Sequence, residues 1–304
     1  MKSLFIDCND QLAPVWQKVI RPDDPPIDVN NKPFERTDLP KMLAGYDIAL
    51  DDHSYMPTDL MAQCKQLRHI VFMGTGAASY MNIAELKDLG ITVHTFKGYG
   101  DTAVAEQTIA LMFAACRQLA RMDREIRAGT WDQLEGVQLL GKTLGIIGLG
   151  GIGAETARIA NGIGMRVIAY NRTPRNDPNV TLVDLDTLLA QSDVISLNLV
   201  LNDQTRGFID AKRIAKMKPG VILVNTARGA LVDEAALLDA LKSGRIRHAG
   251  FDVYHSEPLK ADHPLTRMNN VTLAAHAAFR TPEASMNLLR RAIDITKNIV
   301  GARP

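Results

Sequence analysis

Short apolar runs alternate with helix-like patterns along the first hundred residues. The runs are about four residues long, which is typical of buried strands, and the segments between them repeat their apolar positions every three to four residues, as amphipathic helices do. The predicted strands lie at 4–7, 47–50, 69–73 and 92–95, and the predicted helices at 12–19, 58–64 and 82–89. Strands separated by helices predict a small parallel sheet. The segment 21–40 holds five prolines, so we expect it to be a loop.

The pattern then changes to one long predicted helix, at 101–128, where Met112, Ala115, Leu119 and Met122 recur at steps of three and four. Its length suggests that one side packs on another lobe or subunit. A second series of strands and helices follows. Its predicted strands lie at 144–148, 166–170, 194–198, 221–225, 246–252 and 271–274, and its helices at 151–160, 184–190, 210–217, 233–242 and 282–300. This series predicts a doubly wound sheet.

A glycine-rich turn joins the first strand of that series to its helix. Residues 148–153 read Gly-Leu-Gly-Gly-Ile-Gly, which is the G-x-G-x-x-G pattern between a strand and a helix. The first glycine allows the tight turn, the second allows a diphosphate to approach the backbone, and the third lets the helix pack on the strand. The helix then presents its N-terminal N–H groups to the phosphates. We therefore expect a dinucleotide to bind Gly148, Gly150, Gly151, Ile152 and Gly153.

The residues after the second strand bear on which dinucleotide binds. Enzymes that use NAD usually place Asp or Glu there to bind the ribose, whereas this chain has Asn171, Arg172, Thr173 and, two residues on, Arg175. A carboxylate would repel a 2′-phosphate, and a guanidinium can bind one with two hydrogen bonds. NADP is therefore the preferred prediction. NAD stays open, with Asn171 bonding a ribose hydroxyl and the arginines solvated.

Composition and charge narrow the possible partners. With 304 residues the chain exceeds the usual size of one domain, so two lobes are expected. The net charge of +1 gives no indication of a nucleic-acid or membrane partner, and no apolar run reaches membrane-spanning length. Cys8, Cys64 and Cys116 are few and far apart, which fits reduced thiols in a cytoplasmic protein. His248, His255 and His263 lack the spacing of metal ligands, so we expect no metal and interpret them as surface or loop residues.

Several motifs occur in a characteristic order between residues 69 and 283. They are GTG at 74–76, VAE at 104–106, GKTLGIIGLGGIG at 141–153, NTARGALVDEAAL at 225–237, FDVYHSEP at 251–258, and His276 followed by TPE at 281–283. With these motifs the chain resembles the D-isomer-specific 2-hydroxyacid dehydrogenases.

The resemblance implies an α/β fold with two doubly wound parallel-sheet lobes, in which a Rossmann cofactor domain is inserted in a flavodoxin-like substrate domain. The implied substrate-binding domain comprises residues 1–98 plus 282–304, and the dinucleotide-binding domain residues 99–281. A homodimer is also expected, from the family and from the long helix at 101–128.

The implied reaction transfers a hydride between NADP(H) or NAD(H) and a pair of 2-keto and D-2-hydroxy acids. Arg228 follows a strand end and its guanidinium can hold the carboxylate and polarise the keto oxygen. His276 is the candidate acid-base, and Glu257 is expected to hydrogen-bond its other ring nitrogen. A lone histidine after an apolar strand is more often a core residue, so the assignment depends on all three.

The remaining site residues are less specific. By resemblance, Asp252 lies near the nicotinamide, although it could be a turn residue, and Thr226 belongs to the cofactor site. Backbone N–H groups of Thr75 and Gly76 could bind the substrate carboxylate, or the turn could serve only to join a strand to a helix. A function of another class is also open, since corepressor-like proteins that sense dinucleotides resemble these enzymes.

Overall fold

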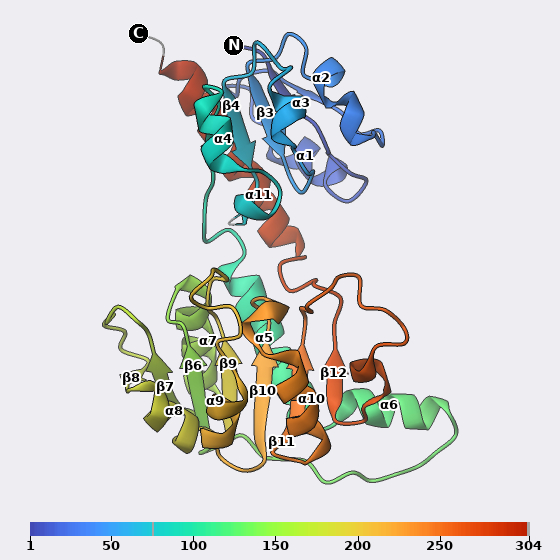
Figure 1. Ribbon diagram of the computed structural model, residues 1–304, viewed down its shortest axis with the longest axis vertical. Coiled ribbons are helices and arrows are strands. Elements are labelled where there is room, and N and C mark those ends of the chain that lie inside the picture. The colour runs from blue at the N-terminus through green and yellow to red at the C-terminus, as the bar shows by residue number, and fades with distance from the viewer. Residues whose placement is uncertain (75, 303–304) are drawn as a thin grey trace. The chain divides into compact units, whose positions relative to one another are not determined.

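The structure is a computed structural model that describes residues 1–74 and 76–302. The chain divides into two compact units (Figure 1). Unit 1 comprises Met1–Gly100 and Arg280–Pro304, and unit 2 comprises Asp101–Phe279. Each unit contains one parallel sheet with helices on both faces, which confirms the predicted α/β class with two doubly wound sheets.

Unit 1 is built on a five-stranded sheet in the order β2-β1-β3-β4-β5. All its neighbouring strands run in parallel, and this order is that of flavodoxin-like folds. The strands are β1 (Ser3–Phe5), β2 (Ile27–Val29), β3 (Ile48–Asp51), β4 (His69–Phe72) and β5 (Thr92–His94). The helices are α1 (Ala13–Val19), α2 (Leu39–Met42), α3 (Thr58–Met61), α4 (Ile83–Asp88) and α11 (Pro282–Gly301), with short 3-10 turns η1 (Arg36–Asp38) and η2 (Ala77–Ser79).

The core of unit 1 has two layers, one on each face of the sheet, because successive side chains of its buried strands point to opposite faces. Phe5 packs with residues of α1 and α11, whereas Leu4 and Ile6 pack with residues of α2, α3 and α4. Successive side chains of a strand point to opposite faces, so a strand with both faces covered reads as a continuous apolar run. The central strands of this sheet could be predicted for that reason.

The expectation of a loop at 21–40 was wrong in part. Residues 27–29 form β2, which pairs with β1 at the edge of the sheet, and η1 and the start of α2 lie further along the same segment. The side chains of β2 are partly or largely exposed. An edge strand of three residues with a polar centre lacks the apolar run that marks a buried strand.

Unit 2 is built on a seven-stranded parallel sheet in the order β12-β11-β10-β9-β6-β7-β8. Counted from β6, this is the Rossmann order with one further strand at the end. The strands are β6 (Thr143–Ile147), β7 (Arg166–Tyr170), β8 (Thr181–Leu182), β9 (Val194–Leu197), β10 (Val221–Asn225), β11 (Ile246–Phe251) and β12 (Val271–Leu273). The sequence predicted six of them and missed β8, which has only two residues, both exposed.

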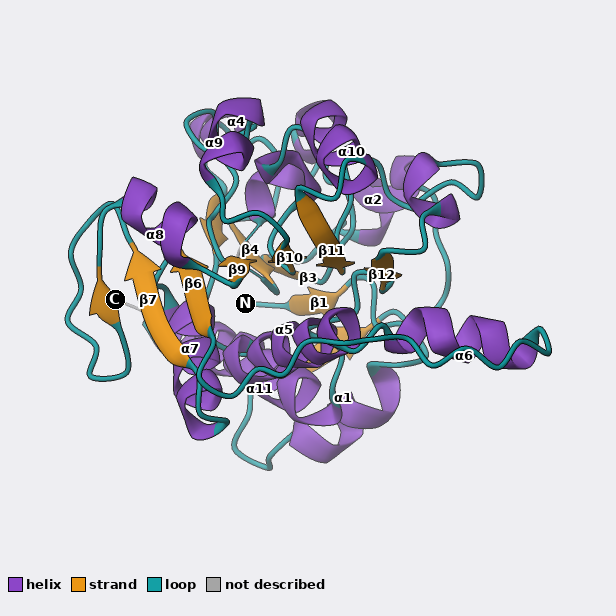
Figure 2. Cartoon of the chain, turned by 90° about the horizontal axis from the view of Figure 1, so that it is seen from below, coloured by secondary structure: helices purple, strands orange, loops and turns teal. Residues whose placement is uncertain are grey.

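Helices cover both faces of this sheet (Figure 2). On one face lie α5 (Asp101–Cys116) and α7 (Gly151–Gly162), and on the other α8 (Leu185–Gln191), α9 (Ala211–Lys216) and α10 (Glu234–Lys242). The last three begin one residue later than predicted, because an aspartate serves as N-cap of each and accepts a hydrogen bond from a backbone N–H in the first turn.

One long helix at 101–128 was also a wrong prediction, because the structure has two helices there. α5 ends at Cys116, and α6 (Leu119–Arg127) begins after Gln118, whose φ is 53°. The backbone N–H of Val137 donates to the carbonyl of Cys116 at 2.8 Å, and the Gln118 side chain donates to the carbonyl of Glu135 at 2.9 Å. These long-range hydrogen bonds stabilise a break that the helical periodicity does not reveal.

One histidine of the unit 2 sheet and the helix lengths remain to be described. The prediction that His248 is a surface or loop residue is wrong. His248 lies in β11 and is buried, with its Nε2 3.1 Å from the Thr272 hydroxyl. Burial lowers its pKa to about 4, and Arg124 and Arg247 act in the same direction. Among residues 1–74 and 76–302, no helix is long and apolar enough to cross a membrane.

Candidate active site

The glycine-rich turn follows β6 and begins α7. Gly148 has a φ of +99°, and a Cβ placed there would lie 2.6 Å from the carbonyl oxygen of Asn198. A Cβ on Gly153 would lie 2.3 Å from the carbonyl oxygen of Gly148. Both contacts are with backbone, so neither position can accept a side chain without moving the turn. The close approach joins the ends of β6 and β9, where the strand order reverses and doubly wound folds bind their ligands.

The middle of the turn has the space that a diphosphate requires. A Cβ placed on Gly150 meets no atom within 4 Å, in contrast to Gly148 and Gly153. Gly150 is the N-cap of α7, a helix of 12 residues, and makes no side-chain cap. The first-turn N–H groups of α7 therefore carry the positive end of the helix dipole beside an open backbone surface. This geometry fits a dinucleotide.

The residues after β7 contact the same turn. Asn171 Oδ1 accepts a hydrogen bond from the N–H of Leu149 at 2.9 Å, and its Nδ2 donates to the carbonyl of Thr173 at 2.6 Å. Arg175 Nη1 donates to the carbonyl of Leu149 at 3.1 Å, and Arg172 Nη1 to Oε1 of Gln204 at 2.8 Å. Asn171 and Arg175 thus hold the glycine turn from one side.

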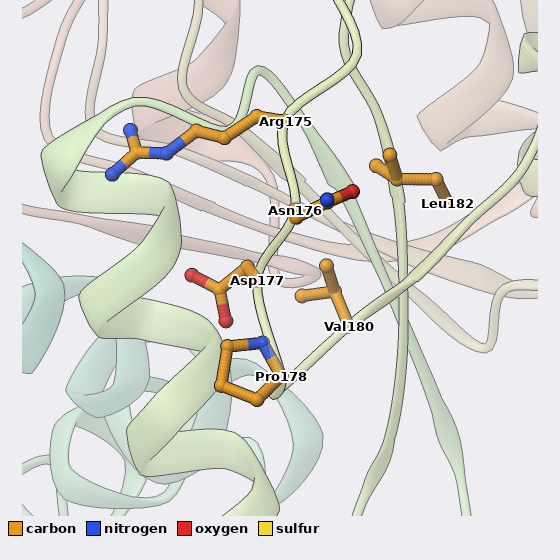
Figure 3. A pocket seen from close by; sticks show the side chains of 6 residues that line it. All are labelled: Arg175, Asn176, Asp177, Pro178, Val180 and Leu182. Carbon is orange, nitrogen blue, oxygen red and sulfur yellow. The ribbon is translucent and has the colours of Figure 1, made fainter.

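An open hollow lies in the segment that joins β7 to β8 (Figure 3). Its lining residues are Arg175, Asn176, Asp177, Pro178, Val180 and Leu182. In the figure the Arg175 side chain extends away from Leu182, toward the helix at the left, and the Asp177 carboxylate points to the same side. Both signs of charge are therefore present beside the end of β7.

Three neighbouring strand ends carry the candidate catalytic residues. β10, β11 and β12 are adjacent and parallel, and they precede Arg228, Glu257 and His276 respectively. Asn225, the last residue of β10, donates from Nδ2 to the carbonyl of Arg228 at 2.9 Å and accepts from the N–H of Ala227 at 3.0 Å. These two bonds fix the turn that carries Arg228, whose Nη1 donates to the carbonyl of Ala227.

The expected contact between His276 and Glu257 is present. His276 Nδ1 lies 2.6 Å from Glu257 Oε2, while Glu257 Oε1 accepts from the N–H of Tyr254 at 2.8 Å. The two side chains are each about one-third exposed, at 37% and 34%. Because Nδ1 faces the carboxylate, Nε2 is the ring nitrogen that can meet a substrate.

Asp252 holds the backbone around His276. Its Oδ1 accepts from the N–H of Ala277 at 3.0 Å and its Oδ2 from that of Ala278 at 2.9 Å. The N–H of His276 donates to the carbonyl of Asp252 at 2.7 Å. Burial raises the pKa of Asp252, and the two N–H donors oppose this shift. His276 has a φ of +50°, a strained conformation for a residue other than glycine, and Asp252 is in place to maintain it.

Gly229 is a site feature that the sequence reasoning missed. A Cβ on Gly229 would lie 2.0 Å from the carbonyl carbon of Tyr254 and 2.3 Å from its oxygen. The segment after β10 therefore crosses the segment after β11 at backbone distance, which brings the neighbourhoods of Arg228 and Glu257 together. The motif NTARGAL contains the signal, since glycine is the residue that permits a close approach of backbone.

Thr226, Thr75 and Gly76 were the remaining candidates. Thr226 is buried, and its hydroxyl lies 2.8 Å from that of Thr108 on α5. Thr75 lies outside the described residues, and Gly76 is the residue before η2 in unit 1.

A polar cluster lies at the carboxyl edge of the unit 1 sheet, and the sequence indicated His53 and Ser54 as polar residues after a strand but not their aspartate partners. Asp7 accepts from the N–H groups of Asp52 and His53, at 2.9 and 3.0 Å, and from the Ser54 hydroxyl at 2.7 Å. Asp51 is fully buried beside them, and burial raises its pKa well above the usual range. The signal for these partners is a pair of aspartates, one two residues after the end of β1 and one at the end of β3.

Comparison with known proteins agrees with this geometry. Residues 109–278 match the model of the D-isomer specific 2-hydroxyacid dehydrogenase family, NAD binding domain. The hydroxypyruvate reductase of Thermotoga maritima is 38% identical over 264 residues, which cover 85% of this chain and 86% of that protein. The crystal structure of a glyoxylate reductase from Paecilomyes thermophila has a TM-score of 0.84 at 30% identity and covers 99% of this chain and 96% of that one.

The D-3-phosphoglycerate dehydrogenase of Archaeoglobus fulgidus is 37% identical over 262 residues, and the match spans 84% of this chain but only half of that protein. The chain belongs to the D-isomer specific 2-hydroxyacid dehydrogenase family. This confirms the resemblance on which the sequence predictions relied. The protein is thus an oxidoreductase with a site for a nicotinamide dinucleotide.

Proposed function

We propose that the protein interconverts a small 2-keto acid and the corresponding D-2-hydroxy acid. The observation that carries this proposal is the 2.6 Å contact of His276 with Glu257 at the strand edge that also presents Arg228. A guanidinium, an imidazole and a carboxylate on one edge supply the binding and proton-transfer groups that this reaction needs.

Arg228 binds the acid. Its guanidinium has donors to spare beyond the bond to Ala227, and a planar fork suits a carboxylate and the adjacent keto oxygen. Donors aimed at the keto oxygen stabilise the negative charge that develops there during reduction. The two bonds of Asn225 hold the turn in position, so little reorganisation is needed when the substrate binds.

His276 moves the proton. In the reduction its Nε2 donates a proton to the keto oxygen, and in the oxidation it accepts one from the hydroxyl. Glu257 fixes the orientation of the ring through its contact with Nδ1, which leaves Nε2 to transfer the proton. Asp252 acts indirectly, as a positioning residue for the loop that carries the ring.

The cofactor binds along the carboxyl edge of the unit 2 sheet, with Gly148, Gly150, Gly151, Ile152 and Gly153 at the diphosphate. When bound, the nicotinamide supplies or accepts the hydride. Asp252 and Thr226 are assigned to the nicotinamide end. Unit 1 is assigned to the substrate, with Thr75 and Gly76 as backbone donors.

We propose NADP(H) as the preferred cofactor. Asn171 places an amide where a carboxylate would repel a 2′-phosphate, and two guanidinium groups, of Arg172 and Arg175, follow the end of β7. Each makes one hydrogen bond to a neutral oxygen, so binding a phosphate exchanges a neutral partner for a charged one, which gives the stronger bond.

The proposed function is tested by oxidation of NADPH, and separately of NADH, against glyoxylate, hydroxypyruvate, pyruvate and bulkier 2-keto acids. We expect turnover with at least one small 2-keto acid and a higher kcat/KM with NADPH. Equal efficiency with both cofactors contradicts the NADP preference alone. Absence of turnover with every acid contradicts the proposed reaction.

We also propose a homodimer, in the cytoplasm, formed through unit 2. Leu119 and Ile126 of α6, and Trp131 and Leu140 after it, are more than half exposed, with Trp131 at 81%. Exposed large apolar side chains on a helix and along the segment after it are expected at an interface. Sedimentation should give twice the mass of the 33.3 kDa chain, and Trp131→Ser with Leu119→Ser should shift it to the monomer. A wild-type monomer at all concentrations contradicts the dimer.

A further inference from the structure

A carboxylate from another helix lies beside the first residue of α7. Asp101 begins α5, and a Cβ placed on Gly151 would stand 1.8 Å from its Oδ2 and 2.8 Å from its Cγ. The space beside Gly151 is therefore filled by the side chain of Asp101. A side chain at Gly151 would have to displace this carboxylate, whereas at Gly148 and Gly153 it would meet backbone.

The position of this carboxylate is electrostatically favourable as long as no other anion is bound. α7 has no acidic residue in its first turn and no side-chain cap at Gly150. A negative charge at a helix N-terminus is stabilising, and here α5 supplies the charge that the sequence of α7 lacks. Asp101 thereby stabilises the packing of α5 on α7, two helices of the same face of the sheet (Figure 2).

A dinucleotide changes this balance. The inference rests on the proposed function, which assigns the backbone of Gly150, Gly151 and Ile152 to the diphosphate. The open side of the turn is at Gly150, and the carboxylate is at the next residue, so the diphosphate and Asp101 use the same positive end of α7. Like charges at neighbouring positions disfavour one another.

We propose that Asp101 is a built-in competitor of the cofactor's diphosphate and lowers the affinity of the protein for dinucleotides. The carboxylate stabilises the N-terminus of α7 in the empty protein and opposes the diphosphate in the loaded one. It therefore favours release of the spent cofactor, and release steps limit turnover in many enzymes.

Asp101→Asn tests the proposal, because asparagine keeps the shape and a hydrogen-bonding oxygen but removes the charge. We expect the Kd of NADPH and of NADH, measured by quenching of protein fluorescence or by calorimetry, to fall about fivefold at low salt. The gain should shrink in 0.5 M salt, where charges are screened. ADP should follow the dinucleotides, and adenosine, which has no phosphate, should bind the two proteins equally.

The matched control is Asp239→Asn. Asp239 is exposed on α10, on the opposite face of the sheet, and its substitution removes the same charge from the same unit (Figure 2). This variant should bind NADPH as the wild type does. A fall in Kd as large as that of Asp101→Asn would mean that net charge, not position, is responsible, and would overturn the proposal.

Other results of these binding measurements would also overturn the proposal. A Kd that is unchanged or higher in Asp101→Asn overturns the proposal and leaves Asp101 as a helix cap, and an equal gain for adenosine overturns it as well. If neither protein binds any dinucleotide, the proposed function fails with it, which is a distinct result. Should Asp101→Asn not fold, Asp101→Ser is the second test: serine also removes the charge and is well tolerated at a helix N-terminus, so the Kd should fall, and no change overturns the proposal.

Discussion

Two parts of the carboxyl edge of the unit 2 sheet are fixed in opposite ways. The glycine turn at 148–153 can keep its shape only because Gly148 and Gly153 have no side chains, since a Cβ on either would collide with backbone. The loops after β10, β11 and β12 are fixed by side chains that hydrogen-bond to backbone, among them Asp252 to Ala277 and Ala278. The cofactor loop thus depends on close approaches of backbone that leave no room for side chains, and the acid-base edge depends on hydrogen bonds that side chains make to backbone.

This difference has a functional consequence. A turn built on glycines exposes backbone N–H groups, which suit a phosphate and make few demands on side-chain geometry. Proton transfer requires a ring at hydrogen-bond distance from the substrate oxygen, so it depends on the loop and the side chain together. We therefore expect substitutions at the acid-base edge to separate chemistry from cofactor binding.

The largest effect is expected for His276→Ala. Loss of the proton donor should lower kcat/KM for the 2-keto acid about 100- to 10,000-fold, the usual contribution of general acid-base catalysis. The Kd of NADPH should change less than twofold, because the glycine turn is untouched. The control is His263→Gln, since His263 also faces a glutamate, with Nε2 3.2 Å from Glu234 Oε1, but has no role in the proposed reaction. Full turnover in His276→Ala would contradict its assignment.

Gly229→Ala should destabilise the folded protein more than any other addition of one methyl group at the acid-base edge. The added Cβ would meet the backbone of Tyr254 at 2.0 and 2.3 Å, and backbone cannot rotate away as a side chain can. We expect the free energy of unfolding to fall by about 2–4 kcal/mol. Gly162→Ala is the control, because a Cβ there meets nothing within 4 Å and its φ is not positive. Equal thermal stability of the two variants would show that the crossing of the two segments is loose.

The same contrast explains what could be predicted from the sequence. The glycine turn and the apolar strands beside it are encoded within a few residues, so the sheet and the turn could be predicted. The break between α5 and α6 depends on Glu135 and Val137, which lie beyond the helix. The edge strands β2 and β8 are too short and too exposed to give a pattern.

At the site, the residue types could be predicted and their contacts only in part. The bond of His276 to Glu257 followed from the chemistry that both residues suggest. The partners of Asp252, 25 and 26 residues further along, are backbone N–H groups, and no sequence pattern marks these. The position of Asp101 beside Gly151 could not be foreseen for the same reason, since the two residues are neighbours only through the packing of α5 on α7.

His248 gives a pH test of the interior beneath this edge. Its pKa is lowered from 6.5 to about 4 by burial, so the folded protein binds a proton there less readily than the unfolded chain. The resulting stability is fully present above pH 6.5 and is lost as the pH falls toward 4, by at most about 3 kcal/mol. We expect His248→Gln to lose less free energy of unfolding than the wild type between pH 7 and pH 5, as measured by urea denaturation. An identical loss in both proteins would contradict the buried neutral histidine.

The smallest effect at the acid-base edge is expected for Glu257→Gln, which keeps the size of the side chain and removes its charge. A hydrogen bond to a charged group contributes about 1.5–3 kcal/mol, so kcat/KM should fall roughly 10- to 100-fold, less than in His276→Ala. Addition of Glu257→Gln to His276→Ala should cost nothing further, because Glu257 acts only through the ring. A further loss in the double variant would mean that Glu257 contacts the substrate itself. Both His276 and Glu257 would then be acid-base groups, and Glu257 would not act only by positioning the ring.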